Sequence, residues 1–191
     1  MSRNIRVIIF ILSSMIFCGG VWYTYTSVKQ NKQIVYYNAT ASFPKGLYKR
    51  KKQKFDYHGR AIKNELIILC GTKTEAFKAA LQRRYLRPST KCNNKAQRLL
   101  KRVHAVQGDV ITMNEEGLWV NGKWVQNSKP LKYDSSGRKM LSINMRNKYL
   151  VKDNEIWVMA EYAKNSFDSR YFGLIPTKHI IDVVEPWLVR K

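Results

Sequence analysis

The sequence has few residues of the types that mark collagen-like, low-complexity or zinc-binding proteins. Its 191 residues include only five prolines and ten glycines, which excludes a collagen-like or low-complexity chain. Three cysteines and three histidines are too few and too scattered for a zinc framework, so neither a metal nor another cofactor is expected. Acidic residues are scarce as well: 13 stand against 35 lysines and arginines, which gives a net charge of +22.

Apolar residues are abundant despite this charge. Hydrophobic residues make up 45% of the chain and aromatic residues 12%, whereas disordered chains lack such content. The length fits one compact domain with a tail or an anchor. A basic folded domain could bind nucleic acid, an anionic membrane surface or an acidic substrate. No nucleic-acid-binding motif is recognisable, so a nucleic acid partner is not expected.

The amino terminus combines a short basic tail with an uncharged run. Residues 1–6 carry two arginines and no acid, and residues 7–23 carry no charge. Twenty helical residues reach about 30 Å, enough to cross the core of a bilayer. We therefore expect a cytoplasmic tail at residues 1–6, a transmembrane signal anchor at residues 7–28 and an extracytoplasmic domain at residues 29–191. A cleaved signal peptide and a buried core helix are the alternatives.

The cysteines bear on the compartment of the domain. Cys18 lies in the uncharged run and is expected to be an inert apolar residue. Cys70 and Cys92 are the only pair in the domain, which suits one disulfide in an oxidising compartment. Such a bridge would close a loop of about 23 residues and contribute on the order of 3 kcal/mol. Two unrelated buried thiols are the alternative. Basic residues flank the uncharged run on both sides, so their count leaves the orientation of the anchor open. Long domains translocate largely regardless of charge, so the basic domain could still lie outside the cytoplasm.

Short apolar runs separated by turn residues predict a mainly β domain with one or two short helices. The Asn121–Gly122 pair favours a two-residue hairpin turn. A helix is predicted over residues 74–87, between a possible cap at Thr74 and Pro88. Residues 130–147 are polar and are expected to form a long excursion. The predicted strands and extended pieces are residues 33–37, 65–70, 98–106, 110–113, the hairpin 117–125, 155–159 and 172–175.

Ser42 is a candidate nucleophile. It lies in the segment TASFPKGLY at residues 40–48, where Pro44 and Gly46 favour a rigid loop that could present a hydroxyl. None of the three histidines lies in a recognisable serine-hydrolase motif, so the base must come from another residue type. From the local pattern alone, an ordinary turn is the alternative.

Lys101 is the candidate base. On the predicted strand it shares a face with Leu99 and Val103, whereas Arg102 points away. A buried lysine loses its proton more easily, because a low-dielectric environment disfavours the ammonium ion, and it can then activate a serine. A snorkelling lysine at the edge of a sheet is the alternative.

Three segments, in this order, resemble the boxes of the bacterial type I signal peptidases. SFP at residues 42–44 is similar to the nucleophile box, and KRVHAVQGD at residues 101–109 resembles the lysine box. NSFDSRYFG at residues 165–173 is close to the NSxDSRYxG signature of the family. The segment TASFPKGLY and the paired cysteines around a helix are similar to the TraF-type branch, which serves conjugative transfer. Gln107 and the segment at residues 160–162 depart from ordinary signal peptidases.

The resemblance implies roles for individual side chains. Ser42 would be the nucleophile and Lys101 the general base. The hydroxyl of Thr40 and the backbone N–H of Ser42 would form an oxyanion hole. Ser166 would orient the lysine. The residues expected to brace and pack this loop are Asp168 and Arg170, as an ion pair, and residues 171–173; a part for Asp168 in the reaction itself, as the TraF-type branch implies, is the alternative.

The resemblance also implies a biological setting. A signal-peptidase-like β domain is expected in the periplasm, held in the bacterial inner membrane by a single pass. The substrate would be a membrane-embedded pilin precursor, cleaved by water or cyclised through its own amino terminus, with an anionic membrane surface as a further partner. A basic stretch at residues 45–63 would be attracted to such a surface by about 1 kcal/mol per charge, although a merely solvated surface is the alternative. A general signal peptidase that acts on preproteins and a non-enzymatic basic envelope scaffold are the competing functions.

Overall fold

The structure of the chain is a computed structural model. It describes residues 34–52 and 62–190 except 142 and 144, together with Met15 and Cys18 in the amino-terminal part. Two compact units are distinguished, Met1–Ile34 and Val35–Lys191. Met15 and Cys18 are helical, but the rest of the predicted tail and anchor lies outside the described residues. Within the described part of the chain, no helix has the length and apolar character needed to cross a membrane.

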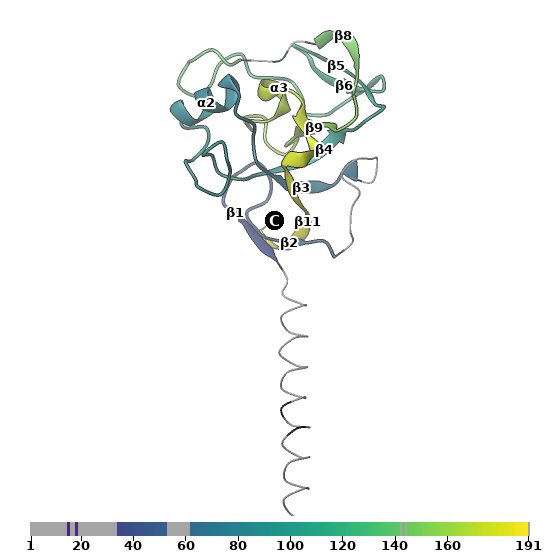
Figure 1. Cartoon of the computed structure of the whole chain (residues 1–191). Helices are drawn as coiled ribbons and strands as arrows, with labels where there is room; N and C mark the ends of the chain where they lie inside the picture. Colours follow the sequence, from purple (N-terminus) through teal and green to yellow (C-terminus); the bar gives the residue numbers. More distant parts are fainter. Residues whose placement is uncertain are drawn as a thin grey trace, which may run out of the picture. The chain divides into compact units, whose positions relative to one another are not determined.

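The larger of two sheets has seven antiparallel strands in the order β1-β2-β11-β3-β4-β9-β10 (Figure 1). The last strand in the sequence, β11, lies between β2 and β3 and joins the two parts of the sheet. The strands are β1 (Val35–Asn38), β2 (Gly46–Arg50), β3 (Leu66–Leu69), β4 (Leu99–Ala105), β9 (Glu155–Met159), β10 (Ile175–Pro176) and β11 (Ile180–Val189).

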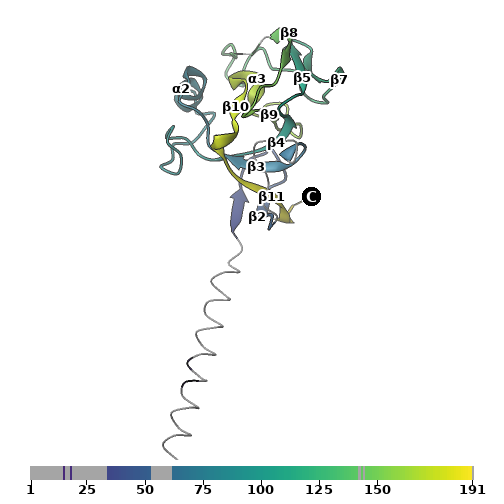
Figure 2. The ribbon, with the colours of Figure 1, turned by 45° about the vertical axis from the view of Figure 1, so that its right-hand side comes forward.

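The smaller sheet has four strands in the order β7-β6-β5-β8. Its strands are β5 (Val110–Asn114), β6 (Gly117–Val120), β7 (Lys123–Trp124) and β8 (Met145–Leu150). The predicted hairpin is confirmed: Asn121 and Gly122 have φ angles of 51° and 75°, as the two-residue turn requires. The four-stranded sheet and the helix α2 (Glu75–Gln82) lie on different sides of α3 (Ser169–Phe172) and β9 (Figure 2).

Three predictions of local structure were wrong. The helix α2 ends well before Pro88, because Arg84 adopts a positive φ of 61° and the chain turns back to bury Leu86. The predicted extended piece at residues 172–175 instead begins at the end of α3, which is capped by the Asp168 side chain. The predicted excursion at residues 130–147 ends in a strand, because β8 begins at Met145 and continues to Leu150. Strand β11 was not predicted.

Two clusters of buried apolar side chains lie on opposite sides of β3. This strand, LIIL, is buried along its whole length. Ile67 and Leu69 belong to the cluster that α2 covers with Phe77, whereas Leu66 and Ile68 belong to a second cluster that includes Phe43. A third cluster fills the four-stranded sheet around Ile111, Met113, Leu118 and Trp157. The mainly β architecture with short helices agrees with the prediction for the domain.

Candidate active site

A buried asparagine holds the loop that presents Ser42. Asn38, the last residue of β1, donates from Nδ2 to the carbonyls of Phe43 at 2.9 Å and Pro44 at 3.2 Å. Its Oδ1 accepts hydrogen bonds from the backbone N–H of Thr40 at 3.1 Å and from the Thr40 hydroxyl at 2.8 Å. The side chain therefore fixes both sides of the turn around Ser42. Sequence reasoning missed Asn38, although an asparagine two residues before Thr40 is the pattern of an Asx turn.

The far end of the same loop is fixed from β2. The buried Tyr48 hydroxyl donates to the carbonyl of Pro44 at 2.7 Å, and Phe43 is packed into the apolar cluster next to Tyr48. Ser42 itself is half-buried between these contacts. A loop that is held at both ends and by its central phenylalanine keeps the serine hydroxyl in a defined place.

Lys101 reaches the Ser42 hydroxyl from the middle of β4. Its side chain is buried, with 3% of the residue exposed. The Nζ atom donates to Ser166 Oγ at 2.6 Å and to Ser42 Oγ at 3.4 Å, and the two hydroxyl oxygens are 3.2 Å apart. The three polar groups, which are 59 to 124 residues apart in the sequence, therefore form a closed triangle.

The surroundings of Lys101 favour the neutral amine. Burial lowers the pKa of Lys101 to about 8, while the Asp168 carboxylate raises the pKa and the Arg170 guanidinium lowers it. Leu99 and Val103, on the same face of β4, are buried, and Ile67 is the partner of Lys101 across the strand pair. The apolar strand face predicted from the sequence is therefore the physical cause of the lowered pKa.

The loop that carries Ser166 is organised around a buried ion pair. Arg170 donates from Nε and Nη2 to the two carboxylate oxygens of Asp168, each at 2.8 Å, and both residues are fully buried. The guanidinium also donates to main-chain carbonyls, including that of Ser166 at 3.2 Å. Asp168 in turn accepts from the backbone N–H of Ala160 on the strand side. The pair thus ties the loop to the end of β9.

The structure contains most of the contacts expected from the sequence, but the Thr40 hydroxyl binds Asn38 and does not point to the expected oxyanion hole. The structure brings Ser42, Lys101 and Ser166 together and places Asp168 against Arg170. The disulfide between Cys70 and Cys92 is formed, as predicted. The hydroxyl of Thr40 donates to Asn38, so it would have to rotate in order to reach an oxyanion. In the described residues, no group of three or more histidine, cysteine or acidic side chains could hold a metal ion.

A second ionic cluster that sequence reasoning missed adjoins the Ser42 loop. Arg102 donates from Nε to the Glu161 carboxylate at 2.5 Å, and His104 Nε2 lies 3.2 Å from the same carboxylate. The Arg102 guanidinium also lies 5.8 Å from the ring centroid of Phe43, the residue after Ser42. Burial raises the pKa of Glu161, but hydrogen bonds from His104 and Arg102 outweigh it and lower the pKa to about 2. The one signal in the sequence for this cluster was the departure of residues 160–162, which include Glu161, from the pattern of ordinary signal peptidases.

The chain is similar to several known proteins. The family described as signal peptidase, peptidase S26, matches residues 5–188. A plasmid transfer protein TraF from Escherichia coli is 30% identical over 149 residues, which cover 78% of this chain and 79% of the relative. A conjugal transfer protein TraF from Agrobacterium tumefaciens (strain 15955) is 25% identical over 184 residues, or 96% of each chain. A solved signal peptidase I from Enterococcus faecalis V583 is 17% identical, with a TM-score of 0.34 over 63% of this chain and 93% of that one.

The matched range of the family contains all three segments that the fold brings together, from the Ser42 loop to the loop of Ser166. The TraF relatives cover more than two thirds of both chains. The chain therefore belongs to the signal peptidase family, peptidase S26, and is a TraF-type member of it.

Proposed function

We propose that this protein is a membrane-anchored serine endopeptidase that processes a pilin precursor for conjugative transfer, with Ser42 and Lys101 as its catalytic dyad. One observation carries this proposal: a buried lysine amine with a pKa of about 8 lies 3.4 Å from a serine hydroxyl on a rigid loop. A nucleophile and a base within reach of each other, with a third group orienting the base, are what acyl transfer to serine requires.

Lys101 takes the proton in the first half of the reaction. Its neutral amine accepts the Ser42 hydroxyl proton while Oγ attacks the carbonyl carbon of the scissile peptide bond. The resulting ammonium then gives this proton to the nitrogen of the leaving fragment as the C–N bond breaks. Ser166 Oγ, 2.6 Å from Nζ, holds the amine in line throughout. The product of this half is an ester between Ser42 and the amino-terminal fragment.

The oxyanion of the tetrahedral intermediate needs donors beside Ser42. The backbone N–H of Ser42 is one, and the Thr40 hydroxyl becomes the second when it rotates away from Asn38. Each such donor is worth about 3–4 kcal/mol of transition-state stabilisation. The ion pair between Asp168 and Arg170 stays outside these steps and keeps the Ser166 loop in place.

Two acceptors can release the acyl group. Water would give a shortened linear product, whereas attack by the substrate's own amino terminus would free the Ser42 hydroxyl and give a circular peptide that is lighter than the linear product by the mass of one water. A pilin precursor is proposed as the substrate because the relatives are named as plasmid and conjugal transfer proteins. Removal of signal peptides from preproteins is the second candidate, because the family that matches residues 5–188 is described as signal peptidase.

The proposed location is the bacterial inner membrane, with one pass at residues 7–28 and the domain from residue 29 onward in the periplasm. The Cys70–Cys92 disulfide supports an oxidising compartment for the domain. A substrate that is itself embedded in the membrane would then meet the peptidase at the bilayer surface.

A paired processing assay tests the function. The full chain is incubated with a pilin precursor and with a secreted preprotein, and the products are analysed by mass spectrometry. We expect the pilin precursor to be shortened, and Ser42→Ala, Lys101→Ala and Lys101→Arg each to abolish the product, because guanidinium cannot act as a base at accessible pH. Cleavage of the preprotein alone would instead support the general signal peptidase.

Matched controls separate the dyad from general damage. Ser135→Ala and Lys73→Ala change exposed residues of the same types and should leave the product yield unchanged. Circular dichroism should show that all variants stay folded. Processing retained in a folded Ser42→Ala protein would rule out Ser42 as the nucleophile, whereas failure of the wild-type chain to process either substrate would favour a basic envelope scaffold.

A further inference from the structure

A cluster of aromatic rings joins α2 to the loop that carries Ser166. The ring of Phe77, in α2, stacks on Phe172 with centroids 4.9 Å apart and meets Phe167 edge-on at 5.7 Å. Phe167 also stacks on Tyr171 at 6.1 Å and lies 6.0 Å from Tyr85. We call these five residues the aromatic cluster. Its centre, Phe167, is the residue between Ser166 and Asp168.

The Ser166 loop is thus held from two sides. On its inner side, the Arg170 guanidinium binds the Ser166 carbonyl and the Asp168 carboxylate. On its outer side, Phe167 packs against the other rings of the aromatic cluster and against the apolar core. The direction of the Ser166 hydroxyl depends on the backbone between these two supports, because a serine side chain has a single rotatable bond to its oxygen.

The segment that supplies the outer support is closed by the disulfide. Cys70 and Cys92 bound the excursion that contains Phe77 and Tyr85, with Cα atoms 5.6 Å apart. At its base the ring of Phe77 packs directly on Gly71, where a Cβ atom would lie 2.0 Å from the ring. Phe77 is buried, with 1% of the residue exposed, so its ring is packed closely on all sides.

We propose that Phe77 is a positioning residue of this active site, which fixes the Ser166 hydroxyl against the Lys101 amine through Phe167, with the disulfide-closed segment at residues 70–92 as its support. The inference rests on the proposed Ser/Lys function. None of the three family boxes contains Phe77. One residue links Phe77 to Ser166, because the ring of Phe167 contacts the ring of Phe77 and Phe167 follows Ser166 directly in the chain.

The expected consequence of loosening Phe77 is specific to the lysine. When the Ser166 loop shifts, the 2.6 Å contact between Ser166 Oγ and Lys101 Nζ lengthens and water reaches the amine. Burial is the main cause of the lowered pKa, so hydration raises the pKa of Lys101 toward the ordinary lysine range. The neutral fraction at pH 8 then falls.

The test measures the titration of Lys101 directly. NMR follows the 13Cε resonance of Lys101, assigned with Lys101→Met, against pH in the full chain. Phe77→Leu, and Cys70→Ser combined with Cys92→Ser, should each raise the pKa of Lys101 above the wild-type value. Leu118→Ala is the matched control, because Leu118 is fully buried in the cluster of the four-stranded sheet and is no part of the aromatic cluster. It should leave the Lys101 titration unchanged.

Processing kinetics give the second readout. In Phe77→Leu, kcat at pH 8 should fall while KM stays the same, and raising the pH should restore kcat. A merely structural loss of folded protein would lower the rate equally at every pH. If Phe77→Leu does not fold, Phe172→Leu tests the same stack at a partly buried position and should raise the Lys101 pKa by a smaller amount.

Two results would overturn the inference: an unchanged Lys101 pKa in the folded Phe77 or Phe172 variant, or an equal rise in the Leu118 control. The NMR titration does not require a cleaved substrate. Failure of the wild-type protein to process any precursor would therefore count against the proposed function and would leave the structural link to Lys101 measurable.

Discussion

At the scale of single residues, burial decides the chemistry. Of the chain's many lysines, Lys101 is the one whose pKa is lowered to about 8 among the described residues, and it is also the one in contact with the Ser42 hydroxyl. The two facts have a common origin. The alternation of β4 turns Lys101 inward with Leu99 and Val103, away from water and toward the serine loop.

The pH dependence of processing follows from this pKa. Only the neutral amine can accept the serine proton, so kcat should rise with pH and level off above about pH 8. Below the pKa, kcat should fall about tenfold for each pH unit, because the fraction of neutral amine falls by that factor. The rate is measured from pH 6 to 10, with the stability of the domain followed by circular dichroism at each value. A rate that falls as the pH rises through this range would contradict a lysine base.

The sequence identified these residues unequally. Ser42, Lys101 and Ser166 lie in linear motifs, so their likeness to a family could be read directly. Arg102 and Glu161 could not be paired in advance, because 59 residues separate them and only the register of β4 against β9 brings them together. Asn38 lies outside the motifs, and its role depends on the path of the loop that follows it.

At the scale of elements, the turn between β1 and β2 is the part whose geometry most directly positions Ser42, the proposed nucleophile. Three carbonyls and one N–H of this turn bind the Asn38 side chain. The rest of the turn has fewer such contacts, and Ser42 lies at its centre. The Asn38 side chain therefore supplies the hydrogen bonds that a regular pairing of the main chain would supply elsewhere in the β1–β2 strand pair.

Asn38→Ala should misplace the serine. The variant removes the contacts that shape the turn, and a misplacement of about 1 Å is enough to cost roughly 100-fold in rate. We expect kcat to fall by that order, with folding retained because the strand pair β1–β2 remains. Asn93→Ala, at an exposed position, is the matched control. An unchanged kcat would show that the turn keeps its shape without Asn38.

Elements with local signals were predicted well, and those held by distant partners were not. The β6–β7 hairpin and the strand β4 are visible as turn residues and apolar alternation. Strand β11 contains Pro186 at a break in its register, which is unfavourable in a strand, and it forms only because β2 and β3 pair with it. The α3 helix is a single short turn, fixed by the Asp168 cap and the buried Arg170.

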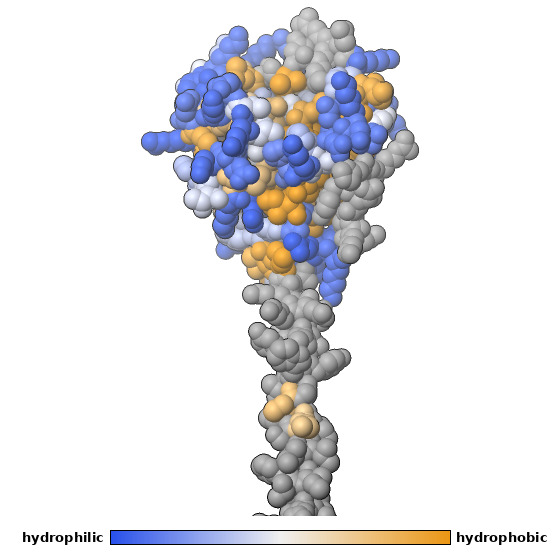
Figure 3. All heavy atoms as spheres, viewed as in Figure 1, coloured by the Kyte–Doolittle hydropathy of each residue, from blue (hydrophilic) through white to orange (hydrophobic). Residues whose placement is uncertain are grey.

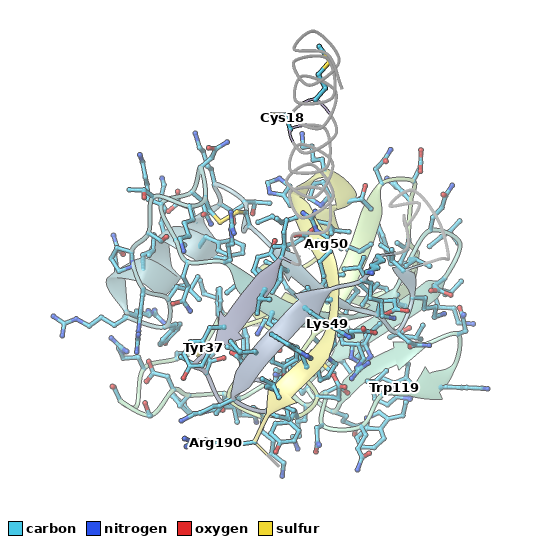
Figure 4. The ribbon with its side chains drawn as sticks, turned by 90° about the horizontal axis from the view of Figure 1, so that it is seen from below. Cys18, Tyr37, Lys49, Arg50, Trp119 and Arg190 are labelled. Carbon is cyan, nitrogen blue, oxygen red and sulfur yellow. A yellow bond between two sulfur atoms is a disulfide. The ribbon has the colours of Figure 1, made fainter. Side chains whose placement is uncertain are left out.

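At the scale of the whole molecule, the surface is dominated by positive charge, although part of it is neutralised. Hydrophilic residues cover much of the face seen in Figure 3, with apolar patches between them. Around β1, β2 and β11, Tyr37, Lys49, Arg50 and Arg190 are seen in Figure 4. Lys49 forms an ion pair with Glu185 and Arg50 with Asp182, so those carboxylates offset two of these charges.

The net charge of +22 predicts binding to anionic lipid. A protein of this charge should bind vesicles that contain anionic lipid more tightly than neutral vesicles, which would hold it through the proposed anchor alone, and this difference should shrink steeply as salt is raised. Co-sedimentation measures both. Duplex DNA is the comparison: equally tight binding to DNA would show an unspecific polyanion effect and would remove the anionic membrane surface as a specific partner.

The place of β11 in the larger sheet sets the order of events when the protein is made. The pair β1–β2 carries the Ser42 turn, the pair β3–β4 carries Lys101, and β11 is the strand that pairs with both parts. Because β11 is synthesised after every other strand, the larger sheet is complete only once the carboxy-terminal residues have emerged and inserted between its two halves. Under the proposed function, a nascent chain is therefore expected to gain activity only after β11 has paired with both halves.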